Sequence, residues 1–280
     1  MNQSPHRNKF YTVLPYIALL IITIGFLFPL FWMFLQSIKQ PLDTIAYPPK
    51  FLFTPTLNNY IDVFSRQGIG RSFFDSFIIA IASVGLAVLI GLPAAYSFAR
   101  YQYRFKDDLA FFLLSTRMMP YVIVLIPFIQ IFSKIHLSDT YFSMISIHIL
   151  LSLALVVWMM RAFFIAIPKE IEEAALLDGC SWFSVITRVI LPLVAPGLAA
   201  TAVISFIFSW NDLMFGYALT SYNIRTLPVR FATEFVGYLE VNWGSVSAAG
   251  IVAVVPVLVF MLFIEKHLVK GFTLGMIEEK

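Results

Sequence analysis

The sequence predicts an all-α polytopic membrane protein, with six transmembrane helices and a cytoplasmic helix-turn-helix loop, as one domain over residues 1–280. Of these 280 residues, 60% are hydrophobic and only 12% are charged, and the mean hydropathy is +0.84. A soluble domain carries roughly a quarter charged residues, so this composition excludes a soluble enzyme and a disordered chain. The net charge of +3 is too small for a nucleic-acid footprint. A single cysteine, Cys180, excludes an intrachain disulfide.

Six stretches meet or approach the roughly 20 apolar residues that a helix needs to cross a membrane. Backbone groups in lipid must be hydrogen-bonded internally, so each stretch is expected to be a helix. The apolar runs are continuous, which disfavours the alternating strands of a barrel. The predicted spans are Tyr11–Ile38, Ser76–Ala99, Leu109–Ser133, Thr140–Met160, Val194–Leu219 and Val246–Ile264.

The first span is longer than the apolar core of a signal peptide, and no small-residue cleavage site follows it, so we expect it to be retained. After it comes a proline-rich outer loop in which Leu57–Phe64 is expected to form a short helix. More of the 19 Lys and Arg residues fall in the inner segments than in the outer ones if the N-terminus is cytoplasmic. This bias predicts that both termini are cytoplasmic.

The inner loop between the fourth and fifth spans carries the clearest pattern. Pro168 suits the first turn of a helix, and the acidic residues that follow it lie near the positive end of the helix dipole. Gly179 suits a left-handed position after that helix. Ser181 is a good cap for a second short helix to about Ile190, which Leu191-Pro192 is expected to stop. The coupling loop is therefore predicted over residues 168–192.

The first helix of this loop is mainly acidic, with Glu170, Glu172 and Glu173 before a pair of alanines. Amphipathic helices that lie on a membrane surface usually carry basic residues on their polar face. The acidic face therefore favours docking to a cytosolic protein over a role at the lipid surface.

The same loop resembles the EAA signature of the permeases of ABC importers. The match runs Glu173-Ala174-Ala175, three residues, Gly179, nine residues, Val189, one residue and Leu191-Pro192; the family has isoleucine at the position of Val189. Other segments are similar to the carbohydrate subgroup of the maltose-permease type, although the tail Ile277–Lys280 departs from its usual glycine ending. These segments are Tyr47–Phe64, Ala99–Phe105, Trp210-Asn211-Asp212, Thr226–Val229 and Gly271-Phe272-Thr273.

The resemblance implies a bacterial inner-membrane permease that moves a sugar or sugar derivative inward by alternating access. Its partners would be a second homologous permease chain, a dimer of cytosolic ATP-binding subunits and an extracytoplasmic solute-binding protein. No phosphate-binding G-x-x-x-x-G-K-[ST] motif is present, so ATP and Mg²⁺ would act on the partner ATPase, and no cofactor or metal is expected on this chain. The residues implied in ATPase coupling are Glu172, Glu173, Ala174, Ala175, Leu176, Asp178, Gly179 and Pro192.

Two charges fall inside the predicted spans, Arg117 and Asp212, and intramembrane charges are candidates for function. At about 1.5 Å per residue they lie at different depths, so direct pairing is not expected. Asp212, together with Trp210 and Asn211, has the chemistry to contact a sugar; a purely structural role for each charge stays open. The possible translocation pathway is therefore Arg117, Trp210, Asn211 and Asp212.

Two other classes of protein remain as alternatives. A stand-alone secondary transporter usually shows an internal repeat, and none is visible in this sequence. A membrane-embedded enzyme needs clustered nucleophiles or metal ligands, and the sequence shows no such cluster. The sequence leaves open which sugar or polyol is carried, and whether this chain or its partner contacts it.

Overall fold

The structure is a computed structural model that describes residues 9–235 and 241–275. The described residues form helices and loops without any strand, which confirms the all-α prediction. The chain divides into two compact units: Met1–Gly68 with Phe235–Val254, and Ile69–Glu234 with Val255–Lys280. Residues 277–280, where the tail departs from the subgroup, lie outside the described part.

The first unit contains α1 (Lys9–Ser37), α2 (Pro41–Thr44), α3 (Asn58–Ser65) and the beginning of α13 (Trp243–Gly275). Helix α3 lies where the sequence predicts a short helix. The buried amide of Asn59 donates hydrogen bonds to the carbonyls of Ser37 at 2.9 Å and Lys39 at 2.8 Å. Gly244 packs against this amide so closely that a Cβ there would lie 2.6 Å from Asn59 Nδ2. The buried side chain of Asn59 thus ties the end of α1 to α3.

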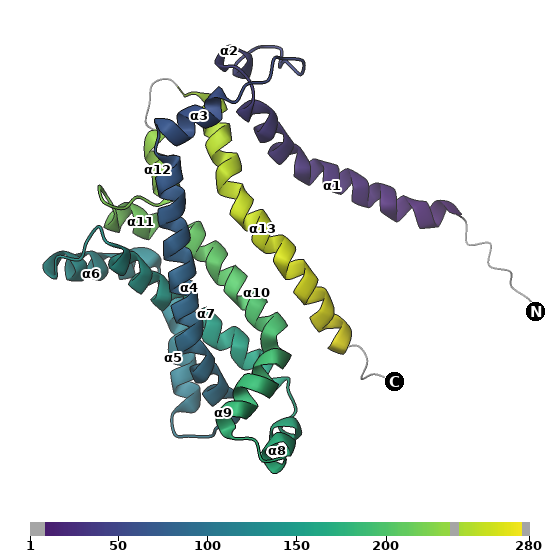
Figure 1. Ribbon diagram of the computed structural model, residues 1–280, viewed down its shortest axis with the longest axis vertical. Coiled ribbons are helices and arrows are strands. Elements are labelled where there is room, and N and C mark those ends of the chain that lie inside the picture. The colour runs from purple at the N-terminus through teal and green to yellow at the C-terminus, as the bar shows by residue number, and fades with distance from the viewer. Residues whose placement is uncertain (1–8, 236–240, 276–280) are drawn as a thin grey trace, which may run out of the picture. The chain divides into compact units, whose positions relative to one another are not determined.

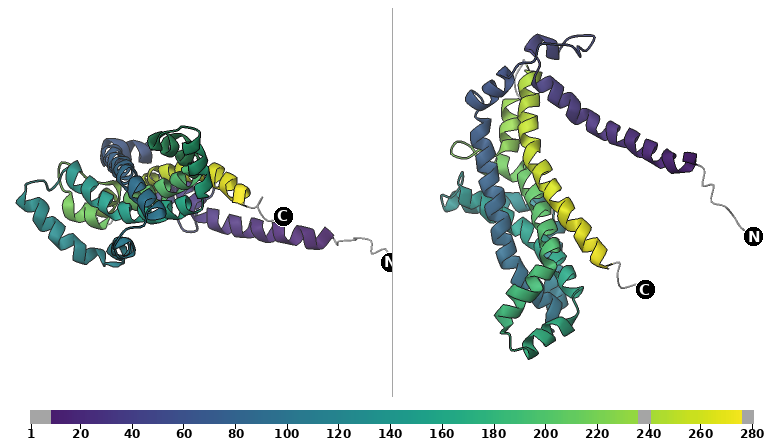
Figure 2. Two further views of the ribbon diagram at one scale, coloured as in Figure 1. Left: turned by 90° about the horizontal axis from the view of Figure 1, so that it is seen from below. Right: turned by 45° about the vertical axis from the view of Figure 1, so that its right-hand side comes forward.

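The second unit is built on three long helices, α4 (Ile69–Arg100), α7 (Tyr141–Ile165) and α10 (Leu191–Trp210). Figures 1 and 2 show these helices running alongside one another, and α4 and α7 pack together most extensively. Gly91 permits their close approach, since a Cβ there would lie 2.7 Å from the side chain of Val156. The buried core between them includes Ala87, Ala95 and Met160.

The single helix expected over Leu109–Ser133 is replaced by two helices, α5 (Lys106–Met118) and α6 (Tyr121–Lys134), which meet at an angle of 92°. The break falls at Met119, whose ψ of 134° is extended. Its cause is Pro120, because the ring of a proline clashes with a helical conformation at the preceding residue.

The fifth predicted span also differs from the structure. Leu191-Pro192 does not stop a helix: α9 (Trp182–Ser184) continues through a π-helical stretch, Val185–Ile190, into α10. Proline lacks an N–H and clashes with the carbonyl four residues earlier, and the wider π turn relieves both constraints. The helix ends instead at Trp210, and α11 (Met214–Leu219) follows after a break at residues 211–213.

The second unit also contains two shorter helices, α8 (Lys169–Leu177) in the inner loop and α12 (Leu227–Glu234), and the part of α13 from Val255 onward. Within the described part of the chain, five helices are long and apolar enough to cross a membrane, and six if α5 and α6 count as one broken span. The chain is therefore a multi-pass membrane protein.

Candidate functional site

The first half of the inner loop has the local features that its sequence predicts, although its second helix runs on into α10. Helix α8 begins after Pro168, and Gly179 follows it with a φ of +86°. No atom lies within 4 Å of the position where a Cβ on Gly179 would stand, so the left-handed backbone, not the available space, requires glycine. Ser181 then caps α9, where its hydroxyl accepts a hydrogen bond from the Ser184 N–H at 3.3 Å.

Glu172, one of the predicted coupling residues, faces into the second unit and not outward. It is buried, and its carboxylate accepts a hydrogen bond from the Tyr96 hydroxyl at 2.8 Å and an ion-paired one from Arg100 Nε at 2.6 Å. Arg100 also donates to the carbonyl of Ile167 at 3.1 Å. The inner loop is therefore bound to the last turns of α4 through Glu172.

The remaining predicted coupling residues divide into two sets. Ala175 and Leu176 are partly buried against the core of the second unit. The second set is exposed: Glu173, Ala174, Asp178 and Gly179. Two neighbouring apolar side chains, Leu177 and Phe183, are also exposed, at 88% and 78%. We call these six residues together the outward face of the inner loop. Pro192 is exposed as well, in the first turn of α10.

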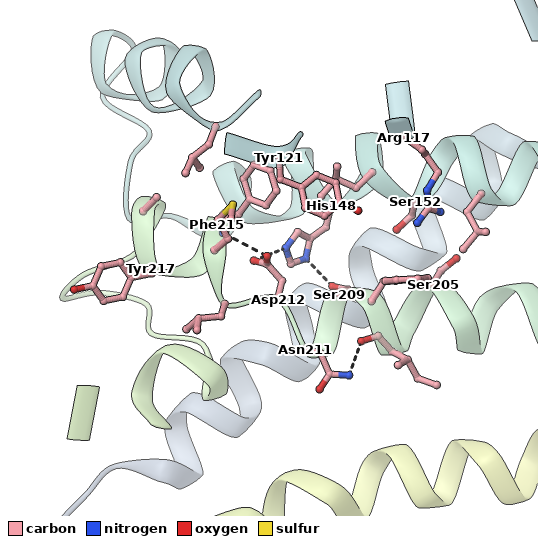
Figure 3. Close-up of a pocket in the computed structure, with 18 of the residues that line it drawn as sticks. Arg117, Tyr121, His148, Ser152, Ser205, Ser209, Asn211, Asp212, Phe215 and Tyr217 are labelled. Atoms are coloured by element: carbon pink, nitrogen blue, oxygen red, sulfur yellow. Dashed lines mark hydrogen bonds and ion pairs between the residues drawn. The ribbon is translucent and has the colours of Figure 1, made fainter. Parts of the chain in front are cut away.

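A cavity of about 930 Å³ lies in the second unit, lined by residues of α5, α6, α7, α10, α11 and α12. Most of its lining is apolar, and the polar side chains among the lining residues are labelled in Figure 3. This volume falls in the ~300–1,000 Å³ range that is typical of small-molecule sites. The predicted residues Arg117, Asn211 and Asp212 all line it.

Asp212 is part of a polar cluster that the sequence analysis missed. His148 joins two of its neighbours: its Nδ1 lies 2.6 Å from the Ser209 hydroxyl, and its Nε2 lies 3.3 Å from Asp212 Oδ2. The Asp212 carboxylate also accepts from the N–H groups of Phe215 at 3.3 Å and Gly216 at 3.0 Å, at the start of α11. The available signal was a histidine inside an otherwise apolar span.

Arg117 stands apart from this cluster. Its guanidinium lies 5.0 Å from the centre of the Phe208 ring, and no ion pair joins it to Asp212 in the described part of the chain. The two charges thus share a cavity without pairing, and the sequence had predicted that they would not pair.

Trp210, which is predicted in the pathway, is not among the residues that line this cavity. It is 2% exposed and its ring packs against Phe206 at 5.5 Å and Phe73 at 5.3 Å. The helix ends just after Trp210, and the change of direction there turns Asn211 and Asp212 toward the cavity while Trp210 remains in the core.

Asp139, in the loop between α6 and α7, organises the segment after α11. Its carboxylate accepts hydrogen bonds from the Ser221 hydroxyl and from the four successive N–H groups of residues 221–224, at 2.8 to 3.2 Å. Burial raises the pKa of Asp139, but the backbone N–H donors more than offset burial and lower it to about 2. Asp139 is therefore ionised at neutral pH and fixes the loop at this end of the second unit.

Among the residues that the structure describes, no group of three or more His, Cys, Asp or Glu side chains is arranged to hold a metal ion.

The chain is similar to known proteins over most of its length. A family model described as "Binding-protein-dependent transport system inner membrane component" matches residues 87–273. The trehalose transport system permease protein SugB of Mycobacterium tuberculosis is 33% identical, over 92% of this chain and 94% of that protein. The sulfoquinovosyl glycerol transport system permease protein SmoH of Agrobacterium fabrum is 30% identical, over 97% of this chain and 96% of that protein.

The fold is also found in a solved structure. The crystal structure of a bacterial ABC transporter involved in the import of the acidic polysaccharide alginate contains a chain that matches with a TM-score of 0.75. The match covers 95% of this chain and 99% of that chain. Because the sequence identity is 19%, the match shows only that the two chains share a fold.

Proposed function

Because the chain belongs to the family of binding-protein-dependent transport system inner membrane components, it is a transmembrane permease component, and we propose that its cargo is a sugar or sugar derivative. Relatives whose names specify trehalose or sulfoquinovosyl glycerol align with nearly the whole chain. Both of these cargoes are glycosides. A small-molecule cavity lined by hydroxyl, amide, imidazole and carboxylate groups supports the same class of substrate.

The energy for transport comes from a dimer of cytosolic ATP-binding subunits, which bind ATP and Mg²⁺. The outward face of the inner loop is the docking surface for one of them. Glu173 and Asp178 offer carboxylates to basic groups, Ala174 permits close approach, and the exposed side chains of Leu177 and Phe183 add apolar area. This combination of a small-residue face, acid and exposed apolar side chains supports docking to a protein surface.

The importer is completed by a second homologous permease chain and an extracytoplasmic solute-binding protein. Both termini of this chain lie in the cytoplasm, and the protein resides in the bacterial inner membrane. The loop that Asp139 fixes then lies on the outer side, where it offers the binding protein an ordered surface.

Transport proceeds by alternating access. Closure of the ATPase dimer moves the inner loop, and Glu172 passes that movement to α4 through Arg100. Since α4, α7 and α10 are packed as one body, they move together, as rigid elements do in domain rotations. The cavity residues Arg117, Asn211 and Asp212 belong to the pathway that this movement opens to each side in turn.

The observation that carries this proposal is the family match over residues 87–273 together with the exposed face of α8. Replacement of Gly179 by valine tests it, because a β-branched residue strains a backbone at φ +86° and changes the direction in which the loop leaves α8. We expect Gly179→Val to insert normally but to lose substrate-stimulated ATP hydrolysis by the assembled importer.

A matched control is Gly85→Val in α4, where no atom lies within 4 Å of the Cβ position and φ is not positive. This variant is expected to keep its activity. Normal coupling in Gly179→Val would refute the docking proposal. Sugar uptake by this chain without any ATPase would instead favour a secondary transporter, and turnover of a substrate would favour a membrane-embedded enzyme.

A further inference from the structure

One end of the cavity in the second unit holds polar groups that lack partners. The Ser205 side chain is fully buried, and its hydroxyl has no hydrogen-bond partner among the described residues. The Nη1 atom of Arg117 is also buried, and it too has no hydrogen-bond partner among the described residues. Figure 3 shows Arg117, Ser152 and Ser205 gathered at this end.

The other polar end of the cavity is already satisfied by the chain itself. The Asp212 carboxylate accepts two backbone hydrogen bonds from α11 and lies 3.3 Å from His148 Nε2. Its negative charge is therefore held in place at the start of a helix, where an anion is stabilised. Asp212 has little remaining capacity to neutralise a cation elsewhere in the cavity.

Among the described residues no carboxylate compensates the charge of Arg117. Its guanidinium lies over the face of the Phe208 ring, 5.0 Å from the ring centre. Arg117 is half-buried, but its Nη1 atom is buried, and a buried N–H or hydroxyl without a partner is costly in apolar surroundings. A ligand that supplies negative oxygen atoms at this place removes both costs.

We propose that this cavity binds a sugar that carries an acidic group, a carboxylate, sulfonate or phosphate, and that Arg117 anchors that group. A planar guanidinium matches two oxygens of such an anion. Ser205 donates a further hydrogen bond, and the hydroxyls of the sugar ring face Asn211 and the His148–Asp212 pair at the other end. This inference rests on the proposed transport of sugars and specifies the class of sugar that this chain selects.

The test uses the complete importer in lipid nanodiscs without nucleotide, and it measures thermal stabilisation by three probes. Since a ligand that binds the folded state raises its apparent stability, D-glucuronate and glucose 6-phosphate are expected to stabilise the wild type more than D-glucose does. Arg117→Gln is expected to weaken the apparent affinity for both anions by about tenfold to a hundredfold. Arg117→Lys is expected to restore part of it, because lysine keeps the charge but not the two-pronged geometry.

One further variant tests the second polar contact, and another serves as a control. Ser205→Ala is close in volume and is expected to fold while reducing anion binding, and Arg66→Gln, an exposed arginine outside the cavity, is expected to behave as the wild type. The proposal is overturned if neither anion exceeds glucose in the wild type, or if Arg117→Gln keeps the preference for anions. Co-purification of the ATPase and second permease, measured on the same samples, reports separately on the proposed function.

Discussion

The ion pair between Arg100 and Glu172 predicts a loss of coupling when its charge is removed. The two side chains are only 7% and 6% exposed and their charged atoms lie 2.6 Å apart, so solvent screens the pair little. Removal of one partner from a buried pair costs about 3–5 kcal/mol, because the other charge is left unpaired. Glutamine at position 172 keeps an acceptor for Tyr96 or Arg100, so we take the lower value, about 3 kcal/mol, for Glu172→Gln.

A loss of that size lowers the ratio of docked to undocked inner loop by roughly two orders of magnitude. The ATPase would still bind the outward face, but its movement would no longer reach α4. We therefore expect Glu172→Gln to keep ATP hydrolysis and to lose most sugar uptake in proteoliposomes, measured as sugar transported per ATP hydrolysed. Glu170→Gln, an exposed acid in the same helix, is the matched control.

A double variant sharpens the test. Arg100→Met combined with Glu172→Leu removes both charges at once, and apolar replacement of a whole buried pair is often neutral. It is expected to couple better than either single variant. The reasoning is refuted if Glu172→Gln transports as well as Glu170→Gln, or if the effects of the two single changes simply add.

Three other predictions concern the fold and the cavity. Asp139 has a folded-state pKa of about 2, below its ordinary value of 3.8. Its contribution to stability is therefore complete above pH 3.8 and is lost as the pH falls toward 2. Hydrogen exchange of residues 221–224 in Asp139→Asn should match that of the wild type near pH 2 and should be faster than in the wild type at neutral pH. Asn59→Ala should destabilise the first unit by about 1–3 kcal/mol, since it removes two buried hydrogen bonds, as a shift in thermal unfolding will show. Trp210→Phe should lower stability without changing the apparent substrate affinity in uptake, whereas Asp212→Asn should weaken that affinity. Equal effects of the two variants on affinity would contradict the assignment of Trp210 to the core.

The local features of the inner loop could be predicted because they follow from single residues. Glycine at a left-handed position, serine at a cap and proline before α8 each act within one turn of backbone, and the structure has all three. The inward direction of Glu172 could not be predicted in this way. It depends on Tyr96 and Arg100, which lie more than 70 residues earlier and reach the loop only once α4 and α8 are packed.

The interruptions of the spans show a similar limit. Apolar runs predict where helices cross the membrane, but not which proline breaks one: Pro120 separates α5 from α6, whereas Pro192 is absorbed by a π-helical stretch. The cavity was only partly predictable for the same reason. Arg117 and Asp212 stand out as charges within apolar runs, whereas His148 gains its place only through contacts with Ser209 in α10 and Asp212 in the break after it.

The central claim is that an ATP-binding subunit docks on the outward face of the inner loop. Photocrosslinking in intact cells tests this claim most directly. A photoreactive phenylalanine analogue at position 174, on this face, should crosslink to the ATP-binding subunit. The same analogue at position 222, which is 95% exposed in the loop held by Asp139, should not. Crosslinking of the ATP-binding subunit to position 222, or its absence at position 174 in an importer that still transports, would contradict the account.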